Sequence, residues 1–190
     1  MTAPGSIVAD IRNGLPEAHT GITGSETILP DMNESCPEPA VTPHLVCKDA
    51  ATIIDFCIQA FGARELHRLH GPDGKSIMHA CLAIGNSRVM LVDENPQWGA
   101  LSPASLGGTP VTIHLQLPDA DATYAQALAA GAVSIMAPTD MFWGDRYGQV
   151  QDPSGHRWSL ATHREILTPE QIAENARVLF SSGKVCSSES

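Results

Sequence analysis

The stretch TPHLVCKD at Thr42–Asp49 has a counterpart in TIHLQLPD at Thr112–Asp119, which begins 70 residues further along the chain. The threonine, the histidine and the final aspartate occupy the same places in both stretches. Gly85 and Gly155 match at the same offset. These four identities in one register, with the same order of predicted elements around them, indicate an internal repeat. The sequence therefore predicts two copies of one folding unit.

The first copy is predicted to fold as a strand, a helix and three further strands. Residues 42–47 alternate as a strand does, and Asp49 then caps a helix that Gly62 ends. Strands follow near residues 65–69, 76–84 and 88–92, with turns at 71–74 and at Gly85. Apolar residues at helical spacing define the buried face of the helix: Ile53, Ile54, Cys57, Ile58 and Phe61.

The second copy repeats this order, with a strand at 111–117, a helix at 119–130 and strands at 134–136, 148–151 and 157–162. We therefore expect an α+β fold of duplicated βαβββ modules, at residues 41–100 and 108–163, within a domain of residues 41–167. We expect residues 1–40 to form either a flexible N-terminal arm or an arm that docks on the domain or on a partner. Thr168, Pro169 and Gln171 predict the start of a helix in the C-terminal segment, residues 168–190.

Composition excludes several classes of protein. The chain has 190 residues, of which 43% are hydrophobic and 17% charged, as in globular proteins. No apolar run approaches the roughly 20 residues that span a bilayer, so no membrane is expected as a partner. A net charge of −10 gives no basic footprint for nucleic acid. Five cysteines form no CxxC pair and no secretory signal is evident, so we expect reduced thiols in the cytoplasm.

Several segments resemble the vicinal oxygen chelate superfamily, which includes glyoxalase I, fosfomycin and bleomycin resistance proteins and extradiol dioxygenases. The resemblance covers about residues 41–170 and is greatest to the PhnB-like branch. It implies that two curved sheets form a cup, or half-barrel, that holds a small-molecule ligand or substrate, and that the protein is a homodimer. The segments are FGARELHR, GPDGKSIMHACLAIGNSRVMLVDE, SPASLGGTPVTIHL and FWGDRYGQVQDPSGHRWSLATH.

Many members of that family bind a divalent metal through His and Glu on the first and last strands of each module. In this chain the corresponding positions hold none of the good ligands for zinc, iron or nickel: Thr42, Val89, Thr112 and Ser159. The resemblance therefore implies no cofactor in this alignment. A shift of two residues keeps the same strand face and places His44 and His114 instead, in which case a divalent metal is the implied cofactor.

His44 and His114 are the candidate catalytic residues, because they occupy equivalent positions in the repeat. Strand alternation places His44 with Thr42 on one face and His114 with Gln116 on the matching face, whereas Val111 points to the apolar face that packs under the helix. A polar concave face is costly unless it is wet or holds a ligand, so we expect both imidazoles to face one cavity. Three roles are open to them: metal ligation, acid–base catalysis or structural hydrogen bonding.

Further residues are candidates for substrate binding. Residues 142–147 combine aromatic rings with a guanidinium fork that suits a carboxylate or phosphonate, although Asp145 and Arg146 could instead pair with the backbone or with each other. Trp98 lies in a Gly- and Pro-containing loop typical of mobile lids. The full set is Thr42, Thr112, Gln116, His79, Met90, Trp98, Trp143, Arg146, Tyr147 and Ser159.

Two functions follow from these residues. The first is a glyoxalase-like enzyme in which the paired histidines move a proton beside the carbonyl of an oxygenated metabolite, in isomerase or lyase chemistry. The second is a non-catalytic protein that binds a small molecule or sequesters an antibiotic. Signatures of other catalytic classes are absent from the sequence: GxSxG, GxxxxGK[ST], HExxH and GxGxxG after a strand.

Overall fold

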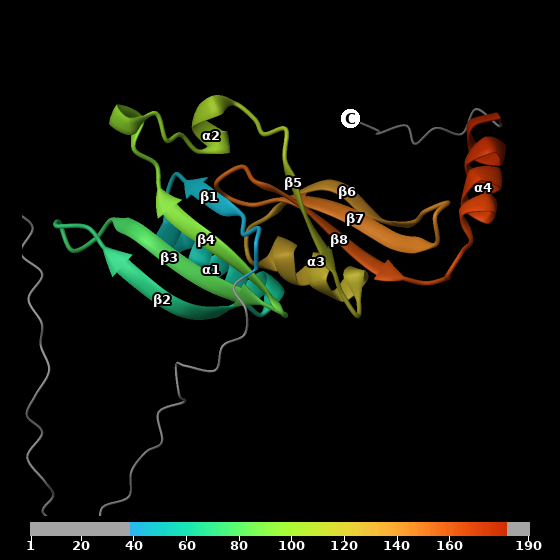
Figure 1. Ribbon diagram of the computed structural model, residues 1–190, viewed down its shortest axis with the longest axis horizontal. Coiled ribbons are helices and arrows are strands. Elements are labelled where there is room, and N and C mark those ends of the chain that lie inside the picture. The colour runs from blue at the N-terminus through green and yellow to red at the C-terminus, as the bar shows by residue number, and fades with distance from the viewer. Residues whose placement is uncertain (1–38, 182–190) are drawn as a thin grey trace, which may run out of the picture. The chain divides into compact units, whose positions relative to one another are not determined.

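The protein is described by a computed structural model that covers residues 39–181 (Figure 1). The expectations for the N-terminal arm and for the end of the C-terminal segment fall on residues 1–38 and 182–190, outside the described part. Among residues 39–181, no helix combines the length and the apolar character that crossing a membrane requires.

The first module has the predicted order of elements. It comprises β1 (His44–Cys47), α1 (Ala50–Phe61), β2 (Arg64–His70), β3 (Ile77–Ile84) and β4 (Ser87–Asp93). The strands form one sheet in the order β1-β4-β3-β2. The β1–β4 pair is parallel, and the other two pairs are antiparallel. The helix therefore crosses from β1 to the far edge of its own sheet.

The second module repeats this topology, which confirms the predicted duplication. Its elements are β5 (Thr112–Gln116), α3 (Ala120–Ala129), β6 (Val133–Asp140), β7 (Asp145–Gln151) and β8 (Arg157–His163). The sheet order is β5-β8-β7-β6, with β5 parallel to β8. Within residues 39–181 the two four-stranded sheets are not joined by strand pairing, so the half-barrel is not closed.

Short helices connect and follow the modules. The connection contains a 3₁₀ turn, η1 (Pro96–Trp98), and a single helical turn, α2 (Pro103–Leu106), which the sequence did not predict. The predicted C-terminal helix is α4 (Pro169–Ser181), and it lies beyond the second sheet, on the side away from β1–β4 (Figure 1). The Thr168 hydroxyl accepts from the Gln171 N–H, and the Gln171 side chain accepts from the Thr168 N–H, as a capping box requires.

The repeated aspartates begin both long helices in the same way. Asp49 has φ −146° and ψ 96°, and its carboxylate accepts from the Thr52 backbone N–H. Asp119 has φ −146° and ψ 102°, and its carboxylate accepts from Ala122. Each side chain satisfies an N–H that the first helical turn leaves without a partner. The repeat therefore preserves the chemistry that starts the helix.

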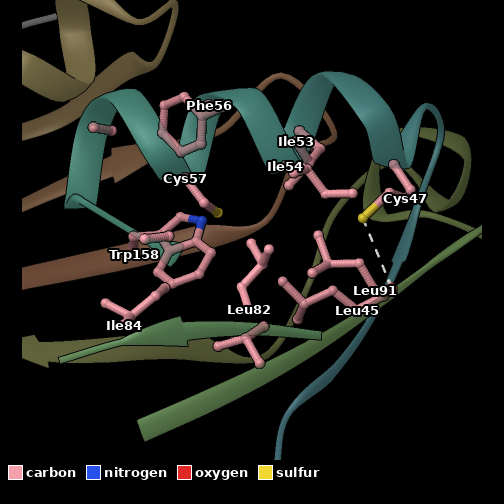
Figure 2. Close-up of a cluster of buried hydrophobic side chains, with 14 of the residues drawn as sticks. Leu45, Cys47, Ile53, Ile54, Phe56, Cys57, Leu82, Ile84, Leu91 and Trp158 are labelled. Atoms are coloured by element: carbon pink, nitrogen blue, oxygen red, sulfur yellow. Dashed lines mark hydrogen bonds between the residues drawn. The ribbon is translucent and has the colours of Figure 1, made fainter. Parts of the chain in front are cut away.

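One hydrophobic core serves both modules (Figure 2). Ile53, Ile54 and Cys57 of α1 are fully buried, and α1 also packs against α3. Trp158 reaches under α1 from β8, and its ring centre lies 4.8 Å from that of Phe61. Because this indole is completely buried between elements of different modules, the two halves fold as one unit.

Two details of the predicted apolar faces are wrong. Ile58 is 41% exposed, and Phe56 is buried in its place on a helix that also packs against α3. Val111 does not pack under its helix with Ile113 and Leu115, since it precedes β5 and is 63% exposed. The two strands of the β6–β7 hairpin are also longer than predicted.

The turn at residues 152–156 attaches the second module to the first. Buried Asp152 accepts hydrogen bonds from the backbone N–H groups of Ser154 and His156 and from Trp158 Nε1, at 2.9, 2.9 and 3.0 Å. The Ser154 hydroxyl accepts from the Lys48 N–H at 2.7 Å. Nε2 of His156 is 3.0 Å from the Val46 carbonyl, to which it donates. These contacts hold β1 beside the second module.

Candidate functional site

A cavity of about 530 Å³ lies between β1 and β5, beneath the segment that connects the modules. His44 and His114 both line it, as does Thr112. Most of the remaining wall is apolar: Pro43, Leu45, Val46, Leu101, Pro103, Leu106, Pro110, Val111 and Ile113. A mainly apolar hollow with a few polar groups is the usual form of a small-molecule site.

The strand register places the two histidines at equivalent positions of the two sheets. His44 is the β1 partner of Met90 on β4, and His114 is the β5 partner of Ser159 on β8. Met90, and not Val89, is thus the counterpart of Ser159, and Val89 is buried on the opposite face. The match between Gly85 and Gly155 does not continue into the strands, because β4 has one more residue before the position that faces β1.

Polar neighbours orient His114. Its Nδ1 lies 2.9 Å from the Ser159 hydroxyl, and its Nε2 lies 3.4 Å from Oε1 of Gln116. The amide oxygen only accepts, so Nε2 carries the proton and Nδ1 accepts from Ser159. The ring also stacks at 6.4 Å on Tyr147, whose hydroxyl accepts from Gln149 Nε2. In this arrangement His114 offers a ligand an N–H donor.

His44 belongs to a group of three imidazoles on the open face of the first sheet. The ring of His79 lies 5.8 Å from that of His44 and 5.0 Å from that of His67. Burial, followed by the two neighbouring imidazoles, lowers the pKa of His79 below its usual range. His79 therefore stays neutral at a pH where an ordinary histidine begins to take up a proton.

The lowered pKa of His79 predicts a loss of stability in mild acid. The unfolded chain protonates this residue near its ordinary pKa of about 6.5, whereas the folded protein resists protonation. The melting temperature should therefore fall as the pH drops below that value, through the range between the two pKa values. His79→Gln should flatten this dependence in melts from neutral to mildly acidic pH. The exposed His70, changed to Gln, is the control, and equal slopes for both variants would contradict the prediction.

The structure brings together only some of the predicted binding residues. Met90 and His79 lie on the His44 face, and Gln116, Ser159 and Tyr147 surround His114, with Trp143 at 5.6 Å from Tyr147. Thr42 lies two residues before β1 begins. Trp98 is 79% exposed and lines a different cavity beside Met78 and Asn95.

Arg146 faces away from the histidines. Its guanidinium forms a forked pair with Asp121 of α3, at 2.9 to 3.2 Å, and a longer contact with Asp140. These hydrogen bonds and charges raise the pKa of Arg146 and lower that of Asp121. Because Asp145 lies on the opposite face of β7, the two neighbours do not pair with each other. The Arg146 guanidinium is therefore paired with carboxylates of the protein itself.

In the alignment without the two-residue shift, the residues at the metal positions are not typical ligands of a divalent metal. Thr42, Thr112 and Ser159 offer hydroxyl groups, and Met90 takes the place expected for Val89 with a thioether. Neither group is the imidazole, thiolate or carboxylate that such ions select. In the part of the chain that the structure describes, no three His, Cys, Asp or Glu side chains are grouped to hold a metal ion.

The contribution of the connecting segment to the cavity wall was not predicted from the sequence. Residues 101–113 supply most of its apolar lining, and His156 from the turn at 152–156 also contributes. The Pro and Gly content of this segment predicted a connection or a lid. Only the exposed Leu106 and its apolar neighbours, within an otherwise polar stretch, could have indicated a binding wall.

Comparison with known proteins identifies the family. A relative from Mycobacterium bovis, itself an uncharacterised protein, is 56% identical over 126 residues, which are 65% of this chain and 82% of that one. TioX from Micromonospora sp. ML1 is 27% identical with a TM-score of 0.53, over 65% of this chain and 97% of TioX.

A fosfomycin resistance protein, FosX from Listeria monocytogenes in complex with Mn(II), shares the fold at 17% identity and a TM-score of 0.51. The matched part is 71% of this chain and 94% of FosX. The sequence pattern of the Glyoxalase/Bleomycin resistance protein/Dioxygenase superfamily matches residues 40–160. With its duplicated βαβββ fold, the chain belongs to that superfamily.

Proposed function

We propose that the cavity between β1 and β5 binds a small, mostly apolar molecule that carries a carbonyl or hydroxyl oxygen, and that His44 and His114 move a proton on it. The observation that carries the proposal is that His44 and His114 line the same cavity. Imidazole exchanges protons readily at neutral pH, which suits isomerase or lyase chemistry beside a carbonyl.

The two histidines have different roles in this proposal. His114 donates from Nε2 to the ligand oxygen, since its Nδ1 is occupied by Ser159. Its contact with Gln116, at 3.4 Å, is long enough for a ligand oxygen to replace it. His44 is exposed and has no hydrogen bond to its ring within residues 39–181, so it is the residue that accepts the proton.

A specific observation favours a second function, binding without turnover. Both ring nitrogens of His114 have partners inside the protein, as in a site built to hold a ligand in place. The apolar wall of the cavity would then bind an aromatic or antibiotic-like compound unchanged. Within the superfamily, this proposal places the protein in the PhnB-like branch.

The proposal includes a homodimer in the cytoplasm. Thr112, His114 and Gln116 are all exposed on β5 of the single chain, and a second copy would shelter this polar face and complete the cup. Cys47 and Cys57 are buried free thiols, and burial raises the pKa of both, which suits a reducing compartment. Light scattering that finds only monomers at micromolar concentration would contradict the dimer.

Hydrogen–deuterium exchange at carbon tests the proton-transfer function across a class of candidate substrates. The protein is incubated in D₂O with a panel of ketones and hydroxyketones, and proton NMR follows the α-protons. We expect wild-type protein to accelerate exchange on at least one compound. His44→Gln and His114→Gln should each slow it about 100-fold, the usual contribution of a general acid or base. His70→Gln is the matched control.

The same experiment separates the two functions. A compound that binds without exchange supports the binding protein over the enzyme. Exchange that both histidine variants retain in full would contradict the assignment of the site. Metal analysis of protein purified without chelator completes the test, because a stoichiometric metal that both variants lose would contradict a metal-free site.

A further inference from the structure

Another histidine is held by a buried carboxylate where β7 begins and β8 ends. Asp145 and His163 are direct cross-strand partners, and His163 Nδ1 lies 2.5 Å from Asp145 Oδ1. Trp143 Nε1 donates to the other carboxylate oxygen at 3.1 Å. Asp145 is only 9% exposed, whereas the His163 side chain is 67% exposed. The buried group therefore fixes an accessible imidazole.

This hydrogen bond determines which nitrogen of His163 is available. A carboxylate only accepts hydrogen bonds, so the shared proton belongs to Nδ1. In the neutral ring, Nε2 then carries the lone pair. Because Trp143 holds the carboxylate from its other side, the imidazole is oriented before any ligand arrives.

Gly144 allows the chain to fold back over this pair. Its φ is +97°, and a Cβ at this position would lie 2.5 Å from the carbonyl oxygen of Glu165. The Gly144 carbonyl accepts from the N–H groups of Arg164 and Glu165, at 2.9 and 3.0 Å. The segment after β8 is thus held against the β6–β7 connection. In the Trp-Gly-Asp run at 143–145, each residue contributes to the arrangement around His163.

The fold-back creates a cavity of about 450 Å³ beside the Asp145–His163 pair. Its walls are mainly apolar, from Trp143, Ile166, Leu167 and Ile172. Among the described residues, Glu165 is the only other charged side chain of its lining, and its carboxylate disfavours an anionic ligand. The walls therefore suit an uncharged molecule with an aromatic or hydrocarbon body.

We propose that this cavity binds an uncharged molecule with an apolar body and an O–H or acidic C–H group, and that His163 is the general base for that group. The proton passes from the ligand to Nε2, which leaves the ligand as its conjugate base and His163 as imidazolium. Return of the proton restores both. This site differs from the cavity of His44 and His114, and the inference does not depend on the function proposed there.

The rate at which diethyl pyrocarbonate modifies each histidine, followed by mass spectrometry, reports how available the lone pair of its imidazole is. The imidazole nitrogen attacks the carbonyl carbon of the reagent, and ethyl carbonate leaves. We expect His163 to react about tenfold faster than the exposed His70, which is the effect of one charge-assisted hydrogen bond. Asp145→Asn should abolish the difference. Asp140→Asn, at an exposed carboxylate nearby, and His44→Gln should leave the His163 rate unchanged.

Protection by phenol tests the ligand class in the wild-type protein, so it does not depend on how well the Asp145 variant folds. Phenol presents an apolar ring and an O–H group, whereas anisole has the ring without the donor. Millimolar phenol should slow the modification of His163 but not that of His70, and anisole should protect less. Equal reactivity of His163 and His70 would overturn the general base, and equal protection or none from the two compounds would overturn the ligand class.

Discussion

Replacement of Trp158 by alanine is expected to lower the free energy of unfolding by about 3–5 kcal/mol, the usual cost of deleting a large aromatic side chain from a core. The indole is completely buried, packs on Phe61 of the other module and donates to Asp152. Its loss leaves a cavity at the junction of the two modules and a carboxylate oxygen without its donor. A loss of this size is a large part of the roughly 5–15 kcal/mol by which a typical domain is stable.

Urea denaturation followed by far-UV circular dichroism measures this effect. Trp98→Ala is the matched control, because that indole is 79% exposed and its loss should change the free energy of unfolding by less than about 0.5 kcal/mol. Equal midpoints for the two variants would show that Trp158 does not join the modules.

Asp152→Ala is expected to cost about 3 kcal/mol or more, because three buried N–H groups lose their acceptor. Burial raises the pKa of Asp152, and the hydrogen bond from Trp158 opposes that rise. The substitution also frees the turn whose Ser154 and His156 hold β1. The variant should therefore lose ligand binding between β1 and β5 as well as stability.

The exposed Asp55 of α1 supplies the control for this second prediction, since Asp55→Ala should leave the unfolding midpoint and ligand binding nearly unchanged. Thermal melts and a binding titration with any compound found by the exchange assay check both readouts. If the Asp152→Ala and Asp55→Ala proteins have the same melting temperature, the turn does not hold the modules together.

Local chemistry made much of the fold predictable. Asp49 and Asp119 start their helices by accepting from the first-turn N–H groups, which depends on residues three apart. Strand alternation placed His44 and His114 on the open faces of their sheets, because side-chain direction has a fixed period of two. The internal repeat then predicted two modules of the same topology, as the two sheets have.

Features that depend on contacts distant in the sequence were not predictable. Phe56 replaces Ile58 on the buried face of α1, a helix that also packs against α3. The counterpart of Ser159 is Met90 because of one added residue in β4, which a glycine match cannot reveal. The apolar cavity wall comes from a connecting segment with no periodicity of its own.

The candidate site was predicted less completely than the fold. Sequence alone could not show that Arg146 is engaged by Asp121, a residue 25 positions away on α3. Nor could it show that Trp98 lines a different cavity. Asp145 and His163 are 18 residues apart in the chain, and only the β7–β8 register brings them together. Cavities arise from tertiary packing, and single residues give little sign of them.

In the proposed function, His44 and His114 face one ligand. Imidazole proton–carbon NMR spectra of the ¹³C-histidine protein, recorded during titration with a compound that passes the exchange assay, test it most directly. The proposal predicts that the signals of both residues shift together with one dissociation constant, while His70 stays in place. A compound that saturates the protein and moves only one of the two signals, or neither, would contradict it.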